Sequence, residues 1–148
     1  MAYSVADDVR TVFGAVSVNS WADLDGDGSG VSARIDAAIE EADAHIDAHI
    51  GFMTTVPLST VPTLIKWLSA RKAGTILYSN RGHIDVDQQS GEELDKLTAM
   101  RREVERTLTN IRTGRIMISG VTPDTSPGVV SIDTPTSTDR ESRGFDNA

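Results

Sequence analysis

Apolar side chains recur every three or four residues over four stretches of the chain, and this is the period of a helix with one buried face. The stretches are residues 4–13, 31–50, 62–80 and 90–113. In the longest of them the repeating positions are Val31, Ile35, Ile39, Ala42, Ile46 and Ile50. The pattern predicts a mainly α protein, a small bundle of about four helices, in which residues 15–30 form a loop.

Polar residues and glycines mark the ends of these predicted helices. Ser4 and Asp7 have the spacing of a capping box at the start of the first helix, and Gly14 and Gly114 follow the first and the last helix. One face of the longest helix is expected to lie in water, because it carries Arg34, Glu40, Glu41, Asp43 and Asp47.

The composition of the chain changes after Gly114. Residues 115–120 alternate bulky apolar side chains with others and are a candidate for one short strand. From Val121 the chain is rich in Thr, Ser and Pro without a helical period, so it can bury little apolar surface to offset its own ordering entropy. We therefore expect a helical body, residues 1–114, followed by an extended C-terminal arm, residues 115–148.

Isolated apolar residues in this arm predict that it docks on a partner. An extended segment can bind through its main-chain hydrogen bonds while alternate side chains fill pockets. The predicted contact residues are Arg115, Ile116, Ile118, Val129, Val130, Ile132 and Phe145.

Charge and composition exclude several classes of function. The net charge of −8 disfavours groove reading of nucleic acid, and the absence of cysteine excludes disulfides and thiol catalysis. No apolar run approaches the roughly 20 residues of a membrane span, and the N-terminus lacks the pattern of a secretory signal, so we expect no membrane partner.

Aspartate (15) outnumbers glutamate (7) and arginine (11) outnumbers lysine (3). A halophilic host and a GC-rich genome both explain this bias, and both explanations stay open.

The segment DLDGDGSG, residues 23–30, has the spacing of a calcium loop of the EF-hand type. Such loops place oxygen ligands at positions 1, 3 and 5, glycine at position 6 and a carboxylate at position 12. Starting the loop at Asp23 puts the cation Arg34 at position 12. Starting it two residues later gives the ligand set Asp25, Asp27, Ser29 and Asp36.

Two interpretations of this segment follow. One is a structural calcium ion that rigidifies the loop, and the other is an Asp/Gly-rich turn that caps the long helix. We expect that the protein requires no cofactor, and a structural calcium ion is the one candidate.

The remaining polar residues do not form a recognisable catalytic motif. His45 and His49 share a helix face, but Ile46 stands where a zinc protease needs glutamate, and a third ligand is missing at helical spacing. Two interfacial or half-buried histidines are therefore the default interpretation. The chain has neither a phosphate-binding loop nor a nucleophile elbow, so we expect that it is not an enzyme.

The order of segments resembles that of the small head–tail adaptor proteins of tailed viruses, also called connector or head-completion proteins. The resemblance covers roughly residues 3–116. It is carried by YSVADDVRTVFG, the loop DLDGDG, the helix ARIDAAIEEADAHIDAHIG, the connector VPLSTVPTLIKWLSARKAGTILY and the ending IRTGRI.

This resemblance implies a helical virion protein without catalytic residues, assembled in the host cytoplasm and located at the head–tail junction. Its partners would be the portal protein, neighbouring copies of itself in a ring of twelve, and the next tail or stopper component. Duplex DNA would pass through the ring without sequence-specific binding, and an acidic lining suits such a channel because it repels phosphate. The alternatives are a small calcium-binding helical module and a small cytosolic helical regulator.

Overall fold

The computed structural model describes residues 1–81 and 91–121 of the chain, and in the last helix the side chains from residue 96 onward. The predicted mainly α fold is confirmed, and no strand forms within the residues described. The helices are α1 (Ala6–Phe13), α2 (Ala15–Ala22), α3 (Val31–Ile50), α4 (Thr63–Asn80) and α5 (Gly91–Arg112).

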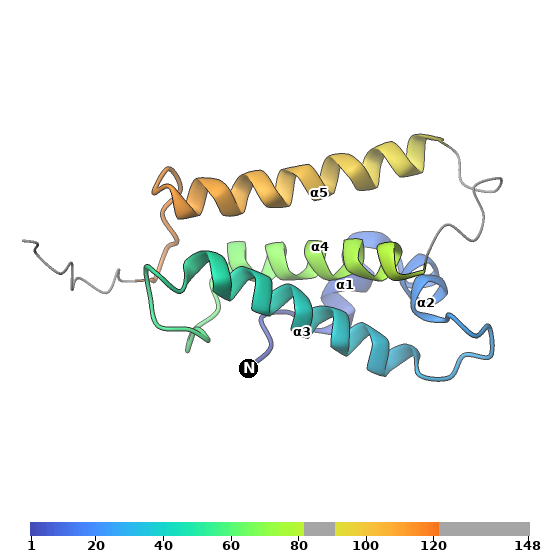
Figure 1. Ribbon diagram of the computed structural model, residues 1–148. Coiled ribbons are helices and arrows are strands. Elements are labelled where there is room, and N and C mark those ends of the chain that lie inside the picture. Colours follow the sequence, from blue (N-terminus) through green and yellow to red (C-terminus); the bar gives the residue numbers. More distant parts are fainter. Residues whose placement is uncertain (82–90, 122–148) are drawn as a thin grey trace, which may run out of the picture.

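Helix α4 forms the centre of the bundle. Helices α3 and α5 run along it and also contact each other, while α1 and α2 pack against its remaining surface (Figure 1). A helix covered on several sides needs small and apolar residues around most of its circumference. The buried residues of α4 meet this need; they are Ile65, Leu68, Ser69, Ala70, Ala73, Gly74, Thr75, Ile76 and Leu77.

The core consists of two clusters along α4. The Trp21 cluster joins α1 and α2 to the first part of α3, the second part of α4 and the start of α5; its larger members are Val9, Val18, Trp21, Ile35, Ile39, Ile76, Leu77 and Leu97. The Ile111 cluster joins α5 to the other halves of α3 and α4; its members are Tyr3, Ile46, Ile50, Leu58, Ile65, Leu68, Val104, Leu108, Ile111 and Ile118.

Residues 15–22, predicted as part of a loop, form α2. Gly14 has φ +88°, and this conformation separates α2 from α1. Val18, Trp21 and Ala22, at helical spacing, are all buried in the Trp21 cluster. The prediction was wrong because the helix is only eight residues long and the apolar Val16 is exposed, which obscures the helical period.

The predicted strand at residues 115–120 does not form. Gly114, with φ +71°, ends α5 in a Schellman arrangement, in which its backbone nitrogen donates to the carbonyl oxygen of Ile111 (3.0 Å) and that of Arg115 donates to Asn110 (2.8 Å). The chain then turns back and buries Ile118 in the Ile111 cluster, leaving it 6% exposed. The alternation of apolar residues thus serves the core of the same chain instead of a strand ladder.

Two predictions about polar residues were also wrong, one at the start of α1 and one on α3. The capping box was predicted for Ser4 and Asp7. The observed contact lies one residue later, where the backbone nitrogen of Val5 donates to the carboxylate of Asp8 (2.9 Å). Ser4 is instead buried against Ser69. Asp43, placed by the helical pattern on the water-facing side of α3, is only 7% exposed.

Candidate functional site

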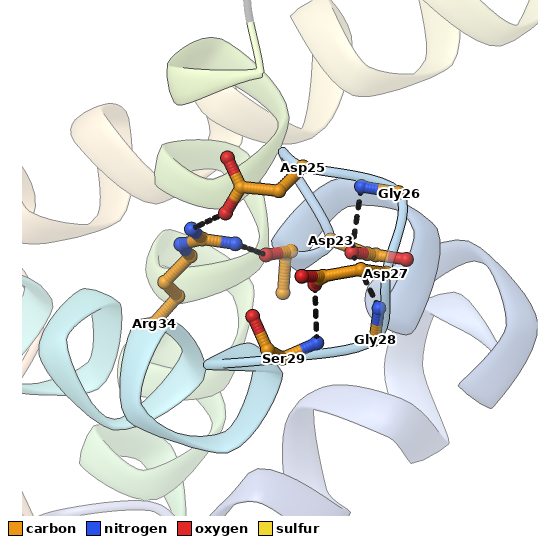
Figure 2. A network of polar contacts seen from close by, with 8 residues as sticks. Asp23, Asp25, Gly26, Asp27, Gly28, Ser29 and Arg34 are labelled. Atoms are coloured by element: carbon orange, nitrogen blue, oxygen red, sulfur yellow. Dashed lines mark hydrogen bonds and ion pairs between the residues drawn. The ribbon is translucent and has the colours of Figure 1, made fainter.

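The aspartate loop, residues 23–30, connects α2 to α3 and is held by hydrogen bonds from its own backbone (Figure 2). Asp23 Oδ1 accepts from the nitrogens of Gly26 (3.0 Å) and Gly28 (3.1 Å), and Asp27 Oδ1 accepts from that of Ser29 (2.7 Å). Hydrogen bonds from the side chain and backbone of Ser29 lower the pKa of Asp27. The loop therefore has a defined conformation, in which carboxylate oxygens accept hydrogen bonds from the loop backbone.

Arg34 supplies a positive charge to this loop. Its guanidinium pairs with the carboxylate of Asp25 and donates to the carbonyl oxygen of Ala22 (2.9 Å) (Figure 2). Arg34, which stands at position 12 of a calcium loop that starts at Asp23, is thus paired with Asp25, the first ligand of a loop that starts at Asp25.

The structure does not bring the predicted calcium ligands together. Among the described residues, no three carboxylates of the loop have oxygens within 4.8 Å of one another. Asp36 instead lines a groove with Met1 and Ala2. The other interpretation was a turn that caps α3. The N-cap residue of α3 is Gly30, and no side chain makes a capping hydrogen bond there. Calcium binding at Asp25, Asp27, Ser29 and Asp36, or at Asp23, stays a prediction.

The groove that includes Asp36 lies between the N-terminal segment and α3 and has a volume of about 550 Å³. Its acidic lining residues are Asp36, Glu40, Asp43 and Asp47. Burial raises the pKa of Asp43. Burial, followed by the hydrogen bond to Asp47, raises the pKa of Tyr3 to about 12.

A second polar cluster lies where α3 meets α5. One nitrogen each of His45 and His49 and a carboxylate oxygen of Glu105 all lie within 4.8 Å of one another. Lys72 of α4 forms an ion pair with Glu105. Burial, then the charge of Lys72, lowers the pKa of His45. Burial raises the pKa of Glu105, but the hydrogen bond and charge of Lys72 outweigh it, so that this pKa lies below its usual value.

Sequence reasoning missed Glu105 as a partner of the histidines. The helical period detects only ligands on the same helix, whereas Glu105 comes from α5. Its proximity depends on the packing of α5 against α3.

The predicted contact residues of the arm occupy different environments. Arg115 is exposed, Ile116 is half-buried, and Ile118 is buried within its own subunit. Met117, which sequence reasoning did not select, is 78% exposed. The other predicted contacts, Val129, Val130, Ile132 and Phe145, lie outside the described residues.

A second exposed apolar side chain lies on the loop after α3. Phe52 is 64% exposed, and its neighbours Met53 and Val56 pack against the Ile111 cluster. Ile116, beside Met117, packs against the same cluster. The loop after α3 and the segment after α5 thus lie at the same end of the bundle (Figure 1). Phe52 and Met117 are exposed on these two segments.

Similarity to known proteins assigns the chain to a family. Across the described ranges, no helix combines the length and apolar character that crossing a bilayer demands. No protein with a curated description matches the chain. The family model for bacteriophage Mu Gp36 matches residues 3–132, which is most of the sequence, and the chain therefore belongs to this family of bacteriophage proteins.

Proposed function

We propose that the protein is a structural subunit of a phage virion, a head–tail adaptor whose ring joins the portal to the tail and extends the DNA channel. Membership of a bacteriophage family supports the viral origin, and the family match includes the whole segment, residues 3–116, that resembles head–tail adaptors. The protein acts without catalysis and resides at the head–tail junction after assembly in the host cytoplasm.

The apolar end of the bundle carries this proposal. Phe52 and Met117 are exposed on two segments that pack into the same core cluster. Large apolar side chains grouped on a surface are typical of sites that a partner covers, whereas scattered ones are ordinary. The described part of the arm, residues 115–121, begins at this end, so one partner could engage both the arm and the end of the bundle.

A ring would form if this end of one copy bound a different surface of the next copy. A patch that docks on a different patch of the next copy gives a head-to-tail interface, and this closes into a ring when the rotation allows it. Twelve copies would place their ends toward the portal on one side and toward the next tail or stopper component on the other. The net charge of −8 would let duplex DNA pass without sequence-specific binding.

The test compares substitution of exposed apolar residues at the end of the bundle with substitution of one elsewhere on the surface. Phe52→Ser with Met117→Ser removes the apolar end, and Val16→Ser is the matched control, because Val16 is 86% exposed on α2. Each protein is mixed with the portal protein of the same phage and imaged by electron microscopy, and its incorporation into virions is measured. We expect the double variant to keep its helicity but lose assembly, while the control assembles like the wild type.

Normal incorporation of the double variant would exclude the apolar end as the docking surface. Virions that join heads to tails without this protein would exclude the adaptor function itself.

A further inference from the structure

Three side chains of the kinds that bind transition metals meet between α3 and α5. His45 and His49 lie one turn apart on α3, with ring centroids separated by 4.7 Å, and Glu105 approaches from α5. Their ligand atoms are all within 4.8 Å of one another. Zinc bonds of ~2.0–2.1 Å in tetrahedral geometry place ligand atoms roughly 3.4 Å apart, so small side-chain rotations would complete the site.

The hydrogen bonds of the histidines leave ring nitrogens available. His49 Nδ1 donates to the carbonyl oxygen of His45 (2.9 Å), which leaves the lone pair on the Nε2 of His49. A backbone carbonyl that holds one ring nitrogen in this way is the usual support of a metal-binding histidine. His45 Nδ1 is buried without a hydrogen-bond partner in the described part of the chain, and a bound ion is one explanation for such an atom.

We propose that His45, His49 and Glu105 form a binding site for a divalent transition metal of the zinc class. Two imidazoles and one carboxylate suit zinc, cobalt or nickel, whereas calcium and magnesium prefer sites made only of oxygen ligands. The bound metal joins α3 to α5. It therefore stabilises the folded chain by an amount that grows with the logarithm of the metal concentration above the Kd.

Lys72 makes this proposal specific. Its ammonium pairs with Oε1 of Glu105, and a metal ion at the same carboxylate must displace this cation or bind beside it. In either case the positive charge of Lys72 opposes that of the metal at Glu105. Removing the lysine charge should tighten metal binding, which a purely structural role of the ion pair does not predict.

The test titrates the purified full-length chain with zinc chloride, followed by isothermal calorimetry and by thermal unfolding. We expect one zinc ion per chain and a higher Tm. Cobalt(II) in place of zinc should give the visible absorption of a four-coordinate site. His49→Gln and Glu105→Gln should each weaken zinc binding at least tenfold, and Lys72→Met should strengthen it severalfold.

Two control variants separate this site from other carboxylates. Glu103→Gln removes a carboxylate of the same helix that pairs with Arg71 (2.6 Å), and Asp25→Asn changes the aspartate loop. Both should bind zinc like the wild type. Absence of zinc binding in the wild type, equal affinity in His49→Gln, or unchanged affinity in Lys72→Met would each overturn the proposal.

Discussion

The backbone nitrogen of Tyr3 donates a hydrogen bond of 2.7 Å to the buried carboxylate of Asp43, forty residues later in the chain. The other oxygen of Asp43 accepts from the hydroxyl of Ser69 (2.5 Å). Since the Ser69 hydroxyl gives its single proton to Asp43, the Ser4 hydroxyl donates to Ser69 (2.7 Å). One buried acid thus connects the N-terminal segment, α3 and α4.

Replacement of Asp43 should separate the role of its hydrogen bonds from that of its charge. Asp43→Leu leaves the Tyr3 nitrogen and the Ser69 hydroxyl unpaired, so we expect it to lower the free energy of unfolding by about 2–4 kcal/mol. Asp43→Asn retains an acceptor and should cost about 1 kcal/mol or less. Urea denaturation at neutral pH measures both, and a loss in Asp43→Leu no larger than that in Asp43→Asn would contradict the role of the acceptor.

The raised pKa of Asp43 gives this comparison a pH dependence. A carboxyl whose pKa is higher in the folded state binds more protons there than in the unfolded chain. Its contribution to stability is therefore complete below the unfolded pKa, near 3.9, and is lost as pH rises through the folded value. We expect the stability of Asp43→Asn relative to the wild type to increase as pH rises from about 4 to 7.

The Tyr3 hydroxyl should matter both as an acceptor and as a titrating group. It donates to Asp47 and accepts from the backbone nitrogen of Leu58 (3.0 Å). Tyr3→Phe leaves that nitrogen without its acceptor, and we expect a loss of about 1–3 kcal/mol in the free energy of unfolding.

Alkaline pH should reduce the difference in free energy of unfolding between the wild type and Tyr3→Phe. The Tyr3 pKa of about 12 exceeds its ordinary value near 10, so the stabilisation is complete below about pH 10 and is lost on approaching pH 12. At pH 11 the wild type should have lost about 1.4 kcal/mol relative to Tyr3→Phe. Denaturation of both proteins at pH 8 and pH 11 tests this, and a constant difference would contradict it.

The long helices could be predicted from the sequence, whereas the polar contacts between them could not. The periodic stretch at residues 31–50 coincides with α3, because its repeating large apolar residues pack into the two core clusters. Asp43 was misplaced because side-chain polarity outweighed its position next to Ala42, which is buried. Glu105 could not be linked to the histidines, since no sequence spacing encodes the packing of α5 on α3.

Replacement of Gly74 by alanine should destabilise the protein, because Phe13 of α1 packs directly against this position of α4. A Cβ at this position would lie 2.0 Å from a ring carbon of Phe13, which packs edge-on against Trp21. Alanine gains about 1 kcal/mol in helix propensity, but displacement of the ring should outweigh this and destabilise the protein by about 1–3 kcal/mol net. Phe13→Leu in the same chain should recover part of the loss, as a double-mutant cycle in urea would show. Additive losses would exclude the contact as the cause.

Calcium binding by the aspartate loop should depend on Arg34. Because its guanidinium occupies the carboxylate of Asp25, we expect Arg34→Met to bind calcium more tightly than the wild type, measured by calorimetry and by the rise in Tm with calcium chloride. Asp36→Asn should weaken binding if the loop starts at Asp25 and leave it unchanged if the loop starts at Asp23. Absence of any calcium effect in both the wild type and Arg34→Met would leave the segment as a turn.

Truncation at two points should separate the folding role of the chain end from its docking role. Ending the chain after Gly114 removes Ile118, which is buried in the Ile111 cluster, and Ile116, which packs against it. We expect this to lower the free energy of unfolding by about 2–4 kcal/mol. Ending the chain after Val121 keeps both residues and should leave helicity and urea denaturation unchanged.

The longer fragment then isolates the docking role of the arm. Each arm contact would be weak, because ordering an extended segment offsets much of the binding energy, but the arms of a ring engage together and at high effective concentration. We expect residues 1–121 to fold like the full chain and to associate with the portal at least tenfold more weakly, while Phe145→Ala in the full chain has a mild effect. Full incorporation of this fragment into virions would leave the helical body, with Phe52 and Met117, as the docking surface.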